Sequence, residues 1–116
     1  MFEKNMKLAY LIDFYIDLLD PHSANIIKAY YDDDLSLAEI AAGEGISRQG
    51  IRHIIKKSEE QILFFEETLG LAKRYSALED AAQRLKALKE LFEEQNLQSA
   101  SAEIDSIVDI ILNKGV

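Results

Sequence analysis

The segment from Ser36 to Lys56 constrains the fold of this chain more than any other part of the sequence. A short helix is predicted to begin at Ser36, because Glu39 follows three residues later and the two side chains can form a capping box. Gly45 can adopt the left-handed backbone that a sharp turn between helices requires. Ser47 then suits the N-cap of a second helix. Two capped helices joined by a tight turn are typical of a helix-turn-helix.

The apolar positions of this segment agree with that prediction. Ala41 lies where the two helices would cross, a point at which a larger side chain would force the backbones apart. The other apolar residues recur at helical spacing toward the same interior, and they are Leu37, Ile40, Ile46, Ile51, Ile54 and Ile55. Gly50 in the second helix costs about 1 kcal/mol relative to alanine, so it is either a close-approach position or a tolerated weakness. An ordinary helical hairpin with a polar outer face is the alternative interpretation.

The second helix presents a polar and basic face. Its candidate nucleic-acid-binding residues are Ser47, Arg48, Gln49, Arg52, His53, Lys56 and Lys57. If this helix enters a major groove, its early side chains reach the base edges, where arginine pairs with guanine and glutamine with adenine. Lys56 and Lys57 come a turn later and suit phosphate contacts. The alternative is a solvated helix face without a ligand.

Charge is unevenly distributed along the chain. The formal net charge is −8 at pH 7, which opposes general nucleic-acid binding because an acidic body repels phosphates. Residues 47–58 nevertheless contain four permanent cations and no carboxylate, and acidic residues flank them on both sides. We therefore expect one basic face on an acidic molecule.

The sequence before the motif predicts two further helices. Met6–Leu19 has a broad apolar stripe at helical spacing. Asp20 followed by Pro21 is typical of a helix start, with aspartate as the N-cap and proline in the first turn. This helix should end at the acidic run Asp32–Asp34, interpreted as a solvated turn because it lacks the glycine and distal glutamate of a calcium loop. The aromatic residues of both helices are interpreted as core, namely Phe14, Tyr15, Tyr30 and Tyr31.

The sequence after the motif also predicts helices. No breaker interrupts the basic helix before Gly70, so we expect this helix to be unusually long. Leu71–Phe92 has an apolar residue every seven positions. Ser99 and Ser101 are candidate caps for a last helix that ends at Gly115.

Together these patterns predict an all-α protein of two parts. Residues 1–70 would form the helix-turn-helix domain, and residues 71–116 a C-terminal helical hairpin that serves as a packing or dimerisation element. Two amphipathic helices alone form a thin layer with few ways to hide both apolar stripes. Part of that surface can pack on the long helix that ends near Leu69, and the rest favours a homodimer. The alternative is a compact monomer whose hairpin folds back over the long helix.

Composition excludes several kinds of site. The chain has no cysteine and two histidines, which excludes disulfides and thiolate zinc sites and disfavours a histidine-based metal site. His53 has no carboxylate nearby in the sequence to orient it as a catalytic base, so no enzyme and no cofactor are expected. The N-terminus lacks the layout of a signal peptide, and no apolar run approaches membrane-spanning length. We therefore expect a cytoplasmic protein.

Several motifs follow one another within residues 3–70, and they are Asp13-Phe14-Tyr15, Leu18-Leu19, Tyr30-Tyr31-Asp32-Asp33, Ser36-Leu37-Ala38-Glu39-Ile40-Ala41 and Ser47-Arg48-Gln49. Together they resemble the YlxM family of small bacterial helix-turn-helix proteins. The resemblance implies a fold similar to domain 4 of sigma factors, which reads promoters, and a connection with the signal recognition particle pathway through gene neighbourhood. The chain departs from the usual family pattern at residues 23–25 and 50–53, which bears on the target and not on the fold.

Two functional classes follow from these observations. The basic helix and the resemblance predict a DNA-binding regulator that uses the residues after Ser47. The acidic net charge favours instead an accessory protein of the export machinery, which keeps the scaffold but binds a protein or an RNA, such as a signal recognition particle component.

Overall fold

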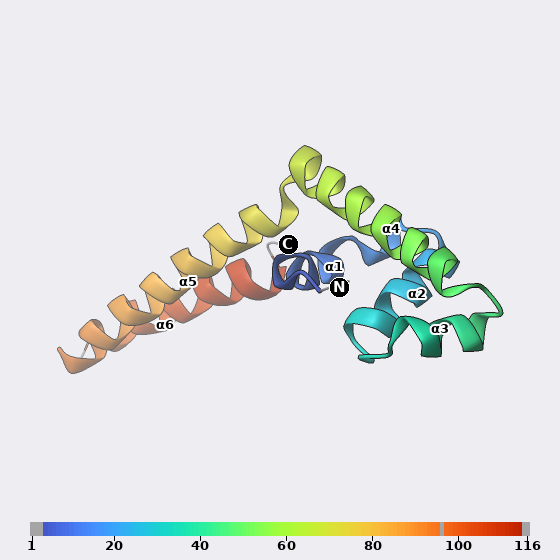
Figure 1. The fold of residues 1–116 in the computed structure, drawn as a ribbon. Coiled ribbons are helices and arrows are strands. Elements are labelled where there is room, and N and C mark those ends of the chain that lie inside the picture. The colour runs from blue at the N-terminus through green and yellow to red at the C-terminus, as the bar shows by residue number, and fades with distance from the viewer. Residues whose placement is uncertain (1–3, 96, 115–116) are drawn as a thin grey trace. The chain divides into compact units, whose positions relative to one another are not determined.

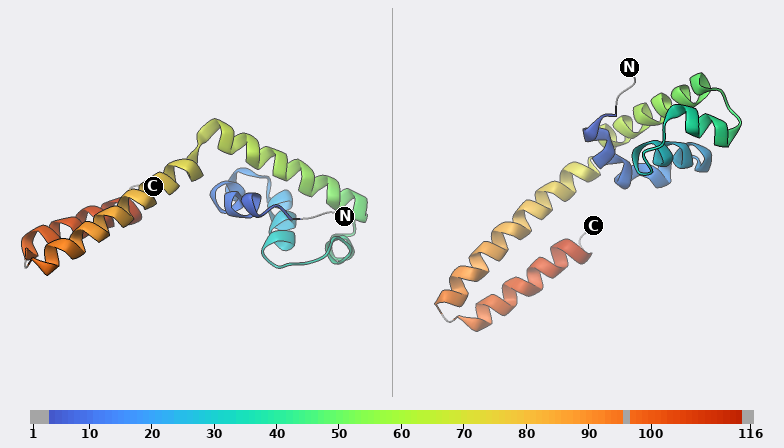
Figure 2. Two further views of the ribbon diagram at one scale, coloured as in Figure 1. Left: turned by 60° about the vertical axis from the view of Figure 1, so that its left-hand side comes forward. Right: turned by 60° about the horizontal axis from the view of Figure 1, so that its bottom comes forward.

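The computed structural model describes residues 4–95 and 97–114, and these residues form helices and turns without any strand. The chain divides into two compact units, Met1–Gly70 and Leu71–Val116, which we call the N-terminal unit and the hairpin unit (Figures 1 and 2). The predicted all-α fold is confirmed.

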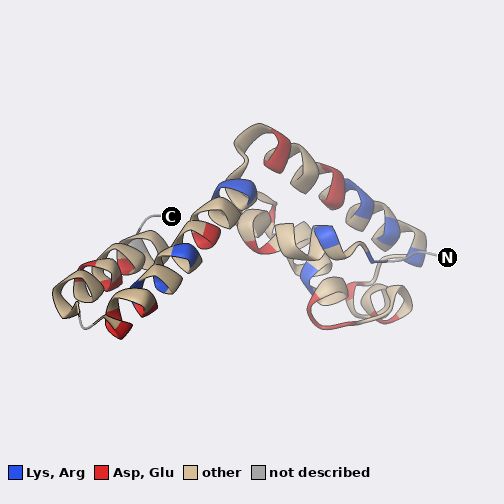
Figure 3. Cartoon of the chain, turned by 90° about the vertical axis from the view of Figure 1, so that its left-hand side faces the viewer, with Lys and Arg blue, Asp and Glu red and all other residues tan. Residues whose placement is uncertain are grey.

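The N-terminal unit contains four α-helices. They are α1 (Met6–Tyr15), α2 (Pro21–Tyr31), α3 (Leu37–Glu44) and α4 (Arg48–Leu69), with a 3-10 turn, η1 (Ile16–Leu18), after α1. The longest is α4, which packs against α1, α2 and α3. Its charges are segregated: Figure 3 shows blue lysine and arginine positions in its first half and red acidic positions in its second.

The first helix ends earlier than the sequence predicts. Its apolar stripe predicts one helix over Met6–Leu19, but α1 ends at Tyr15 and Leu19 is extended, with φ −83° and ψ 156°. This end of the prediction is wrong for a local reason. Asp20 precedes Pro21, whose ring disfavours the α conformation at the preceding residue, and Asp20 is extended; the 3-10 turn Ile16–Leu18 makes the transition from α1 to this extended segment. The 3-10 turn then directs Leu19 into the core, at 7% exposure.

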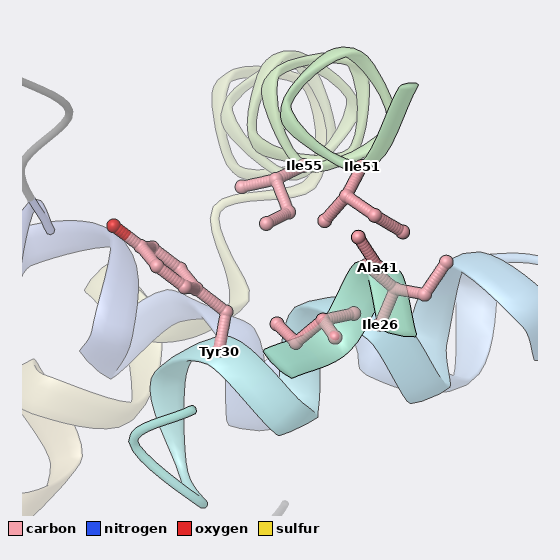
Figure 4. Close-up of a cluster of buried hydrophobic side chains, with 6 residues drawn as sticks. Ile26, Tyr30, Ala41, Ile51 and Ile55 are labelled. Atoms are coloured by element: carbon pink, nitrogen blue, oxygen red, sulfur yellow. The ribbon is translucent and has the colours of Figure 1, made fainter. Parts of the chain in front are cut away.

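A single apolar cluster joins α2, α3 and α4 (Figure 4). Its buried members are Ile26, Tyr30, Ile40, Ala41, Ile51 and Ile55. Each fully buried isoleucine contributes on the order of 1.5–3 kcal/mol relative to an exposed one. Ala41 is 8% exposed and faces the isoleucines of α4, so the predicted crossing point is confirmed.

Local hydrogen bonds determine where α3 and α4 begin. The Ser36 N–H donates to the Glu39 carboxylate at 3.0 Å, and the Glu39 N–H donates to Ser36 Oγ at 3.1 Å, which completes the predicted capping box. Gly45 ends α3 with φ +67°, as the turn requires. The Gly50 N–H then donates to Ser47 Oγ at 3.0 Å and caps α4. The structure therefore contains the predicted helix-turn-helix, with α3 and α4 as its two helices.

Two tyrosine hydroxyls hold the acidic half of α4 against the earlier helices. Tyr31 of α2 donates to Glu59 at 2.5 Å, and Tyr15 of α1 donates to Glu66. The two glutamates are seven residues apart and thus lie on the same face of α4. Burial, reinforced by the hydrogen bond to Glu59, raises the pKa of Tyr31 well above its usual range. Tyr15 is buried in the core, as predicted, and Tyr31 is half-buried against the cluster of α2, α3 and α4, and the polar ends of both also connect helices.

The hairpin unit consists of α5 (Leu71–Glu94) and α6 (Gln98–Asp109), followed by a π-helical turn, η2 (Ile110–Lys114). The two helices lie antiparallel, side by side (Figure 2). Their shared cluster contains the buried Ala82, Ile104 and Val108. Half-buried side chains border it, and they are Leu85, Phe92, Ile111 and Leu112.

The predicted cap of the last helix is wrong. The N-cap of α6 is Leu97, which makes no side-chain capping bond, and both Ser99 and Ser101 lie inside the helix. The Leu97 N–H donates to the Phe92 carbonyl at 2.8 Å, so the backbone closes α5 and opens α6 without a hydroxyl cap. Ser101 is 3% exposed and donates to Glu93 across the hairpin at 3.0 Å. The predicted stop at Gly115 lies outside the described residues.

Candidate nucleic-acid interface

The predicted site residues all lie at the start of α4. Ser47 is the N-cap, and the other six occupy the first three turns of the helix. All seven side chains are exposed. The capped turn and the α3 packing described above fix the direction in which this part of α4 leaves the core, so these side chains have a defined scaffold.

Helical spacing separates these side chains into a central stripe and two flanks. Gln49, Arg52, His53 and Lys56 recur at intervals of three and four residues and therefore share one narrow face. With Ser47 and Gly50 they line one shallow, open depression. Arg48 and Lys57 are not among its lining residues and flank the stripe. The structure thus places Lys56 in the same stripe as Gln49, Arg52 and His53. From the sequence, Lys56 was expected to differ from these residues and to contact phosphates together with Lys57.

Gly50 is a close-approach position. A Cβ atom at residue 50 would lie 2.6 Å from Ile46 Cγ2 and 3.2 Å from Ser47 Oγ. Ile46 is half-buried and packs against the cluster between α2, α3 and α4. The turn therefore occupies the space that a side chain at residue 50 would need. This resolves the question that the sequence left open: glycine at residue 50 is required by close packing against the turn.

Comparison with known proteins identifies the family. A sequence profile described as "Putative helix-turn-helix protein, YlxM / p13 like" (UPF0122) matches residues 2–104. The chain belongs to this family. A UPF0122 protein of Geobacillus kaustophilus (strain HTA426) is 42% identical over 86 residues, which cover 74% of this chain and 78% of that protein.

Two further relatives have the same printed family name. One from Listeria monocytogenes serotype 4b (strain CLIP80459) is 41% identical over 87 residues, covering 75% of this chain and 79% of that protein. One from Exiguobacterium sibiricum is 41% identical over 86 residues, covering 74% and 81%. The family resemblance expected from the sequence motifs is confirmed, and the matched region includes α1–α4.

In this family member, several carboxylates of the N-terminal unit are engaged away from the basic stripe. Asp34 pairs with Lys4, whose ammonium lowers the pKa of that carboxyl. Hydrogen bonds from Ser36 likewise lower the pKa of Glu39. Glu59 accepts from a tyrosine on the inner face of α4. These anions stabilise the scaffold, and residues 47–58 themselves contain no carboxylate.

His22 lies 3.2 Å from Glu44 and joins the start of α2 to the end of α3, which is a structural position. No group of three or more histidine, cysteine or acidic side chains in residues 4–95 and 97–114 is arranged to hold a metal ion. Within the described part of the chain, no helix is long and apolar enough to cross a bilayer.

Proposed function

We propose that this protein binds double-stranded DNA and regulates transcription, with α4 as its recognition helix. The observation that supports this best is the exposed stripe of Gln49, Arg52, His53 and Lys56, which lines an open depression at the start of α4. A recognition helix needs long, exposed donor side chains at its start. The first three turns of α4 carry such side chains.

The proposed roles follow from position along the helix. Arg48, Gln49, Arg52 and His53 would face the base edges, since the earliest residues of a recognition helix reach deepest into the groove. Lys56, a turn further along the stripe, and Lys57, on one flank of it, would contact phosphates, which positions the protein without reading sequence.

Salt dependence provides the direct test of this proposal. Binding of a random-sequence DNA duplex, followed by fluorescence anisotropy, should weaken steeply as salt rises, because each neutralised phosphate releases counterions. A structured RNA of equal length serves as the competitor. Duplex binding that is absent at low salt would contradict the DNA-binding proposal.

A substitution at Arg52 gives the first site-specific prediction. Arg52→Ala should lower duplex affinity and reduce the slope of log affinity against log salt by about 0.9 if it contacts one phosphate. If Arg52 reads a base instead, the slope should stay constant while discrimination at one position relaxes. Arg74→Ala, an exposed arginine of α5, is the matched control and should change neither quantity.

The thermal midpoint separates a binding defect from a folding defect. Arg52 is exposed, so its truncation should leave the midpoint nearly unchanged. Loss of folding in Arg52→Ala would show that this side chain supports the scaffold and would remove it from the proposed interface.

An accessory role in protein export is the second candidate function. Its support is the net charge of −8, together with the exposed Leu63 and Phe64 in the second half of α4, at 42% and 62%. Such side chains suit contact with a protein, for example a component of the signal recognition particle, as the YlxM resemblance implies. RNA or protein binding without duplex binding would favour this candidate. Either function implies a non-enzymatic protein that works in the cytoplasm.

A further inference from the structure

His53 lies in the middle of the exposed stripe at the start of α4. Gln49 precedes it by one helical turn and Lys56 follows it by one turn, while Arg52 is its neighbour in the chain. All four side chains are exposed and line the open depression described above. The amide is always neutral and the two basic side chains are always charged at physiological pH. The imidazole is therefore the part of the stripe whose charge changes between about pH 5 and pH 8.

The surroundings of His53 are cationic. Arg52 and Lys56 carry permanent positive charges, and residues 47–58 contain no carboxylate. In the part of the chain that the structure describes, only residues between 47 and 56 line the depression, so α1, α2 and α3 contribute nothing to its wall although they pack against α4. The tyrosines of these three helices ionise only near pH 10. Their other titratable groups are Lys7, Asp13, His22, Lys28, Glu39 and Glu44.

The two carboxylates of α3 are engaged away from the depression. Glu44 lies 3.2 Å from His22 of α2. Glu39 accepts from the Ser36 N–H at 3.0 Å in the capping box. The anions on the neighbouring helix of the motif thus serve the scaffold, and the charges that line the depression beside His53 are positive.

A bound duplex reverses this electrostatic environment. In the free protein, the neighbouring cations oppose the addition of a proton to the imidazole of His53. In a complex, the phosphates bring a high density of negative charge to the same ring. A charged imidazole also donates from both ring nitrogens, which suits the two acceptors that guanine presents in the major groove. Both effects favour the charged ring in the complex.

We propose that duplex binding by α4 is coupled to the uptake of a proton by His53, so that affinity for DNA rises as the pH falls. This inference rests on the proposed DNA-binding function and adds regulation by pH to it. The added affinity is complete at a pH low enough to charge the ring in the free protein. It is lost as the pH rises through the range in which the complex releases the proton.

Duplex affinity of the full-length chain, measured at constant salt between about pH 5.5 and pH 8, tests the coupling. The unmodified protein should lose affinity by up to about 10-fold as the pH rises, which is the factor that a one-unit difference in proton affinity gives. His53→Lys has a permanent cation and should bind tightly throughout. His53→Gln stays neutral and should bind weakly throughout. Equal thermal midpoints should accompany both changes, because residue 53 is exposed.

His22→Gln is the matched control, because His22 is the other histidine of the chain and is paired with Glu44. This variant should keep the pH dependence of the unmodified protein. Calorimetric titration with the duplex near neutral pH, in two buffers of different ionisation enthalpy, measures the proton directly. The unmodified protein should take up a fraction of a proton on binding, and His53→Lys should take up none.

The outcomes separate this inference from the function on which it rests. Duplex binding that does not change with pH would overturn the coupling and leave the DNA-binding function intact. A pH dependence that persists in His53→Gln, or that disappears in His22→Gln, would also overturn it. Duplex binding that is absent at every pH would contradict the DNA-binding function itself, and the coupling with it.

Discussion

The absence of a side chain at Gly50 affects the stability of the fold. Alanine gains about 1 kcal/mol over glycine in a helix, but its Cβ would lie 2.6 Å from Ile46 Cγ2. Forcing a methyl group into an occupied space costs roughly 1–3 kcal/mol. We therefore expect Gly50→Ala to lower the free energy of unfolding by about 1 kcal/mol, measured by urea titration.

A double-mutant cycle isolates the cause of this effect. Ile46→Ala removes the obstructing methyl group, so Gly50→Ala should become stabilising in that background. Gly45→Ala is the control, because its φ of +67° strains any side chain although no atom lies within 4 Å. Its cost of about 1–2 kcal/mol should not depend on residue 46. An equal effect of Gly50→Ala in both backgrounds would contradict the proposed clash.

The capping box at the start of α3 makes stability depend on pH. Hydrogen bonds from Ser36 lower the pKa of Glu39 in the folded protein. A lowered folded pKa means that the stabilisation is complete above the unfolded pKa of about 4.3. It is lost as the pH falls through the lower folded value.

Comparison with a neutral side chain measures that dependence. Glu39→Gln should therefore be less stable than the unmodified protein at neutral pH, and the difference in thermal midpoint should shrink as the pH falls below 4. Other carboxylates titrate in both proteins and cancel in the difference. A constant gap across this range would show that the ionised form of Glu39 contributes nothing.

At the scale of elements, the crossing of α3 and α4 depends on the small side chain of Ala41. This residue is 8% exposed and is in the cluster with Ile51 and Ile55. Ala41→Leu should destabilise the fold by roughly 1–3 kcal/mol, because the helices must separate to admit it. Ala38→Leu, at an exposed position of the same helix, should be nearly neutral in denaturant melts. A neutral Ala41→Leu would argue against close packing of the two helices.

The starts of α2, α3 and α4 could be predicted because each depends on a side chain next to the backbone it caps. Asp20 accepts from the Ser23 N–H at 2.9 Å, and Ser36 and Ser47 act in the same way. The end of α1 and the start of α6 depend on backbone geometry instead. Leu97 begins α6 without any side-chain cap, so residue type gave no signal there.

Across the whole molecule, local sequence patterns predicted the helices better than the contacts between residues that lie far apart in the chain. Periodicity alone identified the exposed face of α4, but the nucleic-acid role of its residues is still a prediction. The bonds of Tyr15 to Glu66 and Tyr31 to Glu59 join residues 51 and 28 positions apart. No spacing rule links partners at such separations, so these tyrosines were predicted only as apolar core. Gly70, which ends α4 with φ +62°, gave a local signal for the boundary between the two units.

The segregated charges of α4 have one more consequence. A helix has a partial positive charge at its N-terminus and a partial negative charge at its C-terminus, and side chains usually oppose these. In α4 the first turn has no acidic residue and the last turn no basic one, so the side-chain charges add to the macrodipole. The arrangement weakens α4 as an isolated helix. It also concentrates positive potential at the one end of α4 that points toward a phosphate backbone in the proposed complex.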